Sequence, residues 1–135
     1  MGPLKVFLDA NVLFSASLGG PAFELLWELA ERGRVELLTS PYALLEAERN
    51  LDRKRPEAKK AFLRRLRRVR LVPDVPEADL PGLPPGDAIL YAAARRAGAD
   101  VFLTGDRRHF GRLMEDEGAR PRVRTPRAFL LEEGR

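Results

Sequence analysis

This 135-residue sequence contains no cysteine and no glutamine, one histidine, one tryptophan and two asparagines. Without cysteine, disulfides, thiolate nucleophiles and zinc sites built on cysteine are excluded. The longest uninterrupted apolar run, at 88–94, is far shorter than the ~18 residues that a membrane span needs. The N-terminus also lacks the apolar stretch of a signal peptide. We therefore expect a cytoplasmic protein with no membrane segment.

Apolar residues (44%) and charged residues (33%) are plentiful, which indicates a globular chain with a charged surface. The length suits one domain over residues 1–135. The net charge of +4 is unevenly distributed, because residues 53–70 hold ten Lys and Arg against one Glu. That segment carries +9 and leaves −5 for the rest of the chain. Such a basic element on an acidic body is typical of a surface that binds polyanions.

Short apolar segments alternate with helical patterns along the chain. Three segments are continuously apolar and followed by turn or capping residues, as buried parallel strands are: 5–9, 35–39 and 101–104. Weaker strand patterns lie at 70–72 and 122–125. Boundary residues and spacing predict helices at 21–32, at 40–51, at 57–70, from Asp87 to Gly98, and after Pro126. The helix at 57–70 is expected to pack through Phe62, Leu63, Leu66 and Val69. This alternation predicts one α/β domain with a mainly parallel sheet.

Four carboxylates fall at or near the ends of these elements. Asp9 ends the first strand, Asp106 follows the strand at 101–104, Asp87 begins a helix, and Glu46 lies in the helix after the second strand. Ligands of open parallel sheets bind beyond the carboxyl ends of the strands, so these acids could share one edge. Hard cations such as Mg²⁺ and Mn²⁺ prefer oxygen ligands of this kind.

Each acid alone has a simpler interpretation. Asp87 and Asp106 would be ordinary helix caps or turn formers, and Glu46 an ordinary exposed helix residue. Asp9 is harder to explain, because an isolated buried carboxylate is costly and no capping role is expected at the end of a buried strand. Their common placement is what favours a metal site.

The same residues lie in motifs that resemble those of the PIN-domain nucleases. FLDANVLFSA at 7–16 resembles the opening strand of that family, with its metal-binding Asp followed two positions later by Asn. TSPYALLEAERNL at 39–51 resembles the second acidic motif and selects Glu46. GDAILYAAARRAGADVFLTGD at 86–106 is the most specific stretch, and RVRTPRAFL at 122–130 resembles the closing strand and helix.

The resemblance implies a three-layer α/β/α sandwich with a central, mainly parallel sheet. It implies acids gathered around one or two Mg²⁺ or Mn²⁺ ions, and cleavage of single-stranded RNA that leaves a 5′-phosphate and a 3′-hydroxyl. Many small prokaryotic members are toxins of the VapC type, which implies a cognate antitoxin as partner. A homodimer is also implied by the family.

Within this scheme each polar residue has an expected role. We expect Asp9, Asp87 and Asp106 to be direct or water-mediated metal ligands. Glu46 would be a further ligand or would orient the attacking water. Asn11 and Thr104 would orient the carboxylates.

The chain departs from many relatives just after Asp106. Where they place another acid, it has Arg107, Arg108, His109 and Phe110, which favours one tightly bound ion. His109 is the only histidine, and a lone histidine in a loop is expected to be a surface side chain.

The basic segment at 57–70 is more strongly charged than the family pattern requires. Phosphate contacts by its arginines would give affinity for RNA with little sequence specificity, and an acidic protein partner could use the same side chains. The predicted contacts are Arg64, Arg65, Arg67 and Arg68.

Two other enzyme classes are excluded by single positions. Phosphohydrolases of the haloacid dehalogenase type need a second Asp two residues after the first, where this chain has Asn11. They and receiver domains also need a late lysine, but the last one is Lys60. A catalytically silent PIN-like module that binds RNA or protein remains the alternative, and the intact set of four acids argues against it.

Overall fold

A five-stranded parallel sheet forms the centre of the protein in the computed structural model, which describes residues 2–133. The strand order is β3-β2-β1-β4-β5, and every pair of neighbours is parallel. The strands are β1 (Leu4–Leu8), β2 (Val35–Thr39), β3 (Val69–Leu71), β4 (Val101–Leu103) and β5 (Arg122–Arg124). The predicted mainly parallel sheet is confirmed. Of the domain predicted over 1–135, residues 1 and 134–135 lie outside the described part.

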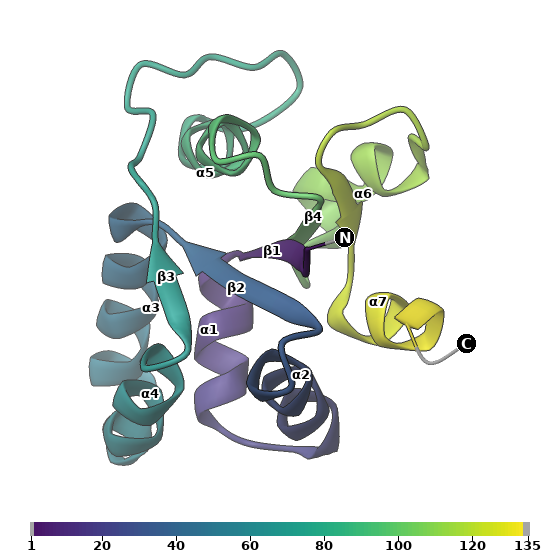
Figure 1. The fold of residues 1–135 in the computed structure, drawn as a ribbon. Coiled ribbons are helices and arrows are strands. Elements are labelled where there is room, and N and C mark those ends of the chain that lie inside the picture. The colour runs from purple at the N-terminus through teal and green to yellow at the C-terminus, as the bar shows by residue number, and fades with distance from the viewer. Residues whose placement is uncertain (1, 134–135) are drawn as a thin grey trace.

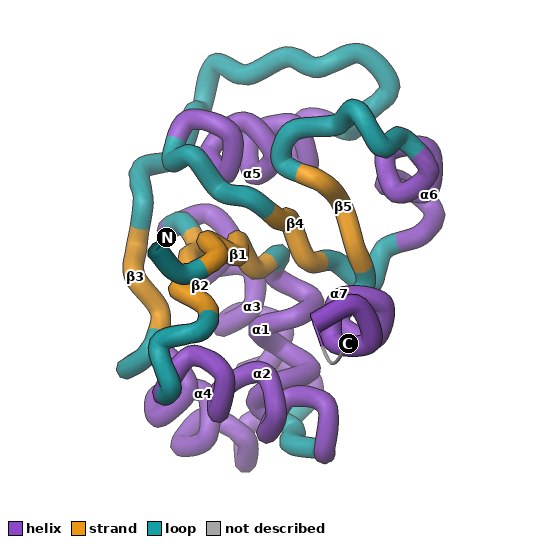
Figure 2. Tube along the Cα trace, turned by 45° about the vertical axis from the view of Figure 1, so that its right-hand side comes forward, coloured by secondary structure: helices purple, strands orange, loops and turns teal. Residues whose placement is uncertain are grey.

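Helices cover both faces of this sheet (Figures 1 and 2). α5 and α6 lie on one side, α1, α2, α4 and α7 lie on the other, and α3 packs against α1. Their bounds are α1 (Ala10–Ser17), α2 (Pro21–Glu31), α3 (Pro41–Lys54), α4 (Lys59–Leu66), α5 (Pro85–Arg96), α6 (Arg107–Glu115) and α7 (Pro126–Glu133), with a 3₁₀ turn at Pro56–Ala58. This arrangement is the predicted three-layer α/β/α sandwich. No helix within residues 2–133 combines the length and the apolar character needed to cross a membrane.

The basic segment is not the single helix expected over 57–70. It begins in the 3₁₀ turn, α4 ends at Leu66, and the chain then enters β3, where Val69 pairs with Leu37 of β2. Parallel pairing supplies backbone partners that override the helical spacing of the side chains. Of the predicted apolar stripe, Phe62 is buried, whereas Leu63 is 53% exposed.

Two short helices were not predicted, and each begins directly after an acid. α1 follows Asp9, whose Oδ1 accepts the backbone N–H of Ala10, and α6 follows Asp106, whose Oδ1 accepts the backbone N–H of His109. The expectation that Asp9 has no capping role is therefore wrong, because a helix starts at the next residue. Asp87 does not cap α5, which begins two residues earlier.

An aromatic cluster attaches α5 and α6 to the central strands. Phe7 of β1 stacks on Phe102 of β4 with 5.5 Å between ring centroids, and Phe110 of α6 lies 4.9 Å from Phe102. Tyr91 of α5 packs edge-on against the same ring. These contacts set the positions of α5 and α6, and Asp87 and Asp106 lie at the N-terminal ends of these helices.

Candidate active site

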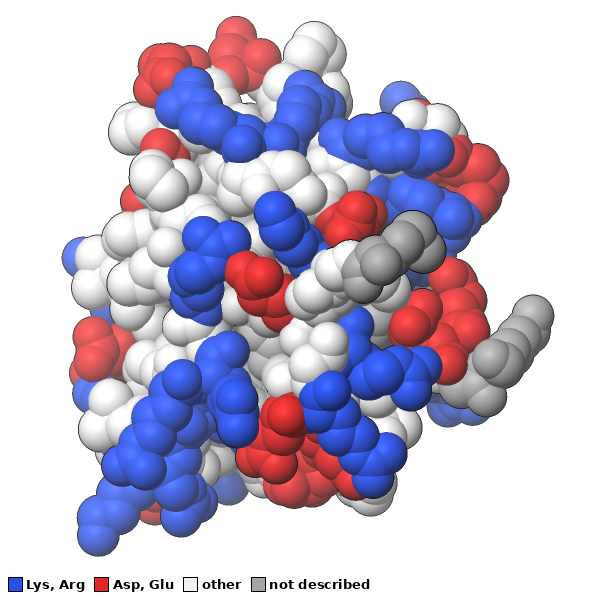
Figure 3. Space-filling model, in the orientation of Figure 1, with Lys and Arg blue, Asp and Glu red and all other residues white. Residues whose placement is uncertain are grey.

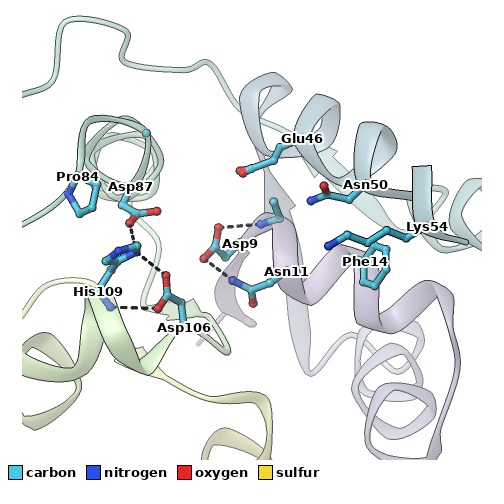
Figure 4. A pocket seen from close by; sticks show the side chains of 12 residues that line it. Asp9, Asn11, Phe14, Glu46, Asn50, Lys54, Pro84, Asp87, Asp106 and His109 are labelled. Atoms are coloured by element: carbon cyan, nitrogen blue, oxygen red, sulfur yellow. Dashed lines mark hydrogen bonds and ion pairs between the residues drawn. The ribbon is translucent and has the colours of Figure 1, made fainter. Parts of the chain in front are cut away.

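The four predicted acids meet in one cavity at the carboxyl ends of the central strands. The cavity has a volume of about 450 Å³, and Asp9, Glu46, Asp87 and Asp106 all line it (Figure 4). Each acid comes from a different place in the fold: the start of α1, the middle of α3, the first turn of α5 and the start of α6. Asn11 also lines the cavity, so five of the six residues predicted to act here are brought together in it.

Asp9 is only 4% exposed, and its carboxylate is satisfied by three donors. Oδ1 accepts the N–H of Ala10 at 2.7 Å. Oδ2 accepts hydrogen bonds from Nδ2 of Asn11 at 2.9 Å and from Oγ1 of Thr104 at 2.7 Å. A buried carboxylate requires partners of this kind. The donors hold the carboxylate in one orientation at the end of β1.

Asn11 and Thr104 also connect Asp9 to the segment that carries Asp106. Oδ1 of Asn11 accepts the backbone N–H of Gly105 at 2.8 Å. Oγ1 of Thr104, which is fully buried, accepts the backbone N–H of Asp106 at 3.0 Å. One hydrogen-bonded network thus joins the ends of β1 and β4.

His109 lies between two of the acids, which the sequence did not predict. Its Nδ1 atom is 2.8 Å from Oδ2 of Asp106 and 3.1 Å from Oδ2 of Asp87 (Figure 4). The spacing of three residues from Asp106 was the available signal, because it places the two side chains together in the first turn of a helix. The contact with Asp87 depends on how α5 and α6 pack and has no signal in the sequence.

Burial, with a smaller contribution from neighbouring negative charges, raises the pKa values of Asp9, Glu46 and Asp87. Burial raises the pKa of Asp9, three hydrogen bonds oppose this, and the charge of Asp106 adds to it. Partial loss of water raises the pKa of Asp87 to about 6, with a further contribution from the charge of Asp9 and an opposing one from His109. Glu46 is exposed at the rim, yet loss of part of its hydration and the charge of Asp9 raise its pKa too.

This combination fits a divalent cation. Carboxylate oxygens are the preferred ligands of Mg²⁺ and Mn²⁺, and acids that disfavour each other's ionisation are stabilised by a positive charge among them. Asp9, Glu46, Asp87 and Asp106 could all supply oxygen donors to the cavity. The chemistry open to such a site is metal-assisted hydrolysis.

Two further polar residues reach the cavity and were not predicted. Asn50 and Lys54 follow Glu46 at intervals of four residues on α3, so the three side chains share one face of the helix (Figure 4). This face of α3 therefore runs from an acidic side chain, Glu46, to a basic one, Lys54. The interval of four was the available signal.

The predicted RNA-contacting arginines lie away from this cavity. Arg64, Arg65 and Arg68 line a second cavity of about 750 Å³ between the end of α1, α2 and α4. Figure 3 shows basic side chains gathered where Figure 1 places α4, with acidic side chains next to them over α2. Arg67 is exposed and lines neither cavity.

Arg65 differs from the other arginines because it is engaged within the protein. Its side chain is 16% exposed, lies 5.0 Å above the ring of Trp27 and pairs with Glu24 at 2.7 Å. It also donates to the carbonyl of Ala16 at 3.3 Å, at the end of α1. Arg65 thus helps to attach α4 to α1 and α2.

Comparisons with known proteins identify the family and the fold of the chain. The family model that describes the PIN domain matches residues 5–108. A chain of the crystal structure described as VapBC2 from Rickettsia felis, bound to a DNA fragment from their promoter, superposes with a TM-score of 0.59 at 13% identity. The match covers 81% of this chain and 92% of that one, and at this identity it shows a shared fold. No curated protein matches the sequence.

Proposed function

The chain belongs to the PIN domain family, and from this premise we propose that it is a metal-dependent endoribonuclease that cleaves single-stranded RNA. The observation that carries the proposal is the meeting of four carboxylates from four separate elements in one open cavity, together with the raised pKa values of Asp9, Glu46 and Asp87. The intact set of four acids argues against a catalytically silent module.

We propose a role in metal binding or catalysis for each of the four acids. We assign Asp9, Asp87 and Asp106 to holding Mg²⁺ or Mn²⁺, as one or two ions. When bound, such an ion lowers the pKa of water and stabilises charge developing on a phosphate. Glu46 would be a further ligand or orient the attacking water, since its carboxyl lies at the exposed rim of the cavity.

Positioning falls to Asn11 and Thr104, which hold the carboxylate of Asp9 through two hydrogen bonds. The expected products are a 5′-phosphate and a 3′-hydroxyl, formed by in-line attack of water.

For RNA binding we propose the exposed arginines of the basic segment, Arg64, Arg67 and Arg68, as phosphate contacts outside the cavity. Arg65 belongs to the predicted set, but its internal contacts leave its charge less available to a ligand. Phosphate contacts of this kind give affinity rather than sequence preference.

As partners we propose a cognate antitoxin and a second copy of the chain. The fold shared with a chain of a VapBC2 complex supports the antitoxin, so the protein would act as the toxin of such a pair. An RNA substrate would be met in the cytoplasm, which is the location we propose.

Cleavage of a mixed-sequence single-stranded RNA tests the proposal. Purified protein is assayed with Mg²⁺, with Mn²⁺ and with chelator, beside Asp9→Asn and Asp87→Asn variants prepared identically and checked for folding by circular dichroism. We expect metal-dependent cleavage that both variants lose. Cleavage that persists in the variants would indicate a contaminant, and no cleavage under any condition would favour the binding module.

A further inference from the structure

We propose that Nδ1 of His109 is a direct ligand of the divalent ion, together with Asp87 and Asp106, and that this nitrogen shifts the site's preference from Mg²⁺ toward first-row transition metal ions. The inference rests on the proposed metal site and deepens it by naming a specificity-determining ligand. It starts from three side chains whose ligand atoms lie within 4.8 Å of one another.

The distances around His109 suit ligands that share one ion. Two donor atoms that each lie 2.0–2.2 Å from an ion, at right angles, are about 3 Å apart. Nδ1 of His109 lies 2.8 Å from Oδ2 of Asp106 and 3.1 Å from Oδ2 of Asp87. Nδ1 therefore already lies at the spacing of a neighbouring ligand from each of the two carboxylate oxygens.

The backbone holds the imidazole in this place. The N–H of His109 donates to Oδ1 of Asp106 at 3.0 Å in the first turn of α6, so one carboxylate contacts both the main chain and the ring of His109. The next residue, Phe110, is fully buried against Phe102 and anchors the turn to the sheet. With Nδ1 turned toward the acids, the ring presents its nitrogen to the cavity (Figure 4).

Donor chemistry then gives the direction of the preference. Mg²⁺ takes oxygen ligands and binds imidazole poorly, whereas imidazole nitrogen suits the later first-row ions. A site of two carboxylates and one imidazole retains Mg²⁺ binding through its oxygens. Through its nitrogen it gains affinity for Co²⁺ and, to a smaller extent, for Mn²⁺. Without the ring, the remaining acids form an all-oxygen site.

One other arrangement uses the same distances. A protonated His109 could donate to both carboxylates and act as a counter-ion that a metal must displace. Replacing His109 would then tighten the binding of every divalent ion, because a competing positive charge is removed. Replacing His109 should thus weaken metal binding if the ring is a ligand and strengthen it if the ring is a counter-ion.

The test measures metal binding directly, in the absence of RNA. Wild type, His109→Ala, His109→Gln and the neighbouring surface control Arg108→Ala are titrated calorimetrically with Co²⁺, Mn²⁺ and Mg²⁺ at a pH of about 8, where free imidazole is neutral. We expect both His109 variants to lose about 10–100-fold in Co²⁺ affinity and less in Mn²⁺ affinity, with little change for Mg²⁺. Arg108→Ala should match the wild type.

A spectroscopic signature identifies the nitrogen itself. Electron spin echo spectra of bound Mn²⁺ should show ¹⁴N modulation from a directly bound imidazole in wild type and Arg108→Ala, and lose it in His109→Ala. Absence of this modulation in the wild type, tighter metal binding in the variants, or no binding of any ion would each overturn the inference. A protein that binds ions with the expected pattern but cuts no RNA would leave the inference standing and refute the proposed function.

Discussion

The hydroxyl of Thr104 donates a 2.7 Å hydrogen bond to the buried carboxylate of Asp9, across 95 positions of sequence. The two residues meet because β1 and β4 are parallel neighbours with Leu8 paired to Leu103, so the residue after each strand stands beside its counterpart. The same hydroxyl accepts the N–H of Asp106. The side chain of Thr104 thus holds two of the proposed metal ligands, Asp9 and Asp106, in position relative to each other.

Thr104→Val should therefore weaken both the fold and the metal site. The variant keeps the shape of the side chain but removes a donor from a buried carboxylate and an acceptor from a backbone N–H, at a cost of about 1–3 kcal/mol. Denaturant unfolding in chelator measures this loss, and calorimetry should show weaker Mn²⁺ binding. Thr104→Ser, which keeps the hydroxyl, is the matched control. A Val variant as stable as the wild type would show that the hydroxyl has no such role.

The pKa of Asp87 gives a stability that depends on pH. Its folded value of about 6 lies above the value of about 3.9 for an unfolded Asp, so the folded state holds a proton that the unfolded state has lost. In chelator, the stability of the wild type should fall as the pH rises through this window. Asp87→Asn lacks this contribution and should become steadily more stable relative to the wild type from about pH 4 to about pH 7.

Thermal unfolding of the two proteins across this range measures the difference. In saturating Mn²⁺ at neutral pH the wild type should instead be more stable than Asp87→Asn, because it gains metal-binding energy that the variant lacks. A difference that does not vary with pH in chelator would show that the carboxyl of Asp87 ionises normally.

The sequence predicted the strands that carry the site because their signal is local. Continuous apolar runs identified β1, β2 and β4, and the acids after them could then be placed at one edge of the sheet. α1 and α6 were missed because they are only eight and nine residues long. A single residue separates β1 from α1, and only three residues separate β4 from α6. Asp9 and Asp106 are both a cap and a candidate ligand, and the sequence suggested only one role for Asp9.

The contacts that distinguish similar residues could not be predicted. Arg64 and Arg65 are adjacent and look alike in the sequence, yet only packing against α2 places Arg65 over Trp27. In the same way, His109 becomes part of the site because the aromatic cluster packs α5 and α6 against each other and against β4. These contacts arise from tertiary packing between elements that are distant in the sequence, so no short segment predicts them.

Replacing Arg65 should lower the stability of the protein more than replacing Arg64. Arg65→Ala removes an ion pair, a cation–π contact and a hydrogen bond to the end of α1, and we expect a loss of about 1–3 kcal/mol in the free energy of unfolding. Arg64→Ala, at an exposed position on the same helix, should stay within about 0.5 kcal/mol of the wild type. Chemical denaturation of both variants measures the contrast, and similar losses would contradict the structural role of Arg65.

Lys54 offers a test of how RNA enters the site. It lines the acidic cavity at its end furthest along α3 from Glu46, and its side chain extends into that cavity (Figure 4). A cation there would hold a phosphate near the carboxylates and offset their repulsion of the RNA backbone. We therefore expect Lys54→Ala to weaken RNA binding and to lower the slope of log affinity against log salt by about 0.7, the value for one phosphate contact on a single strand.

Fluorescence anisotropy with a labelled single-stranded RNA, in Ca²⁺ or in chelator to prevent cleavage, gives both quantities. Lys60→Ala, an exposed lysine that does not line this cavity, is the matched control for the loss of one positive charge. If both lysine variants lose the same affinity, Lys54 contributes only to the general positive field. A loss confined to Lys54→Ala, with Mn²⁺ affinity unchanged, would show that the RNA backbone passes along the face of α3 that carries Glu46, Asn50 and Lys54.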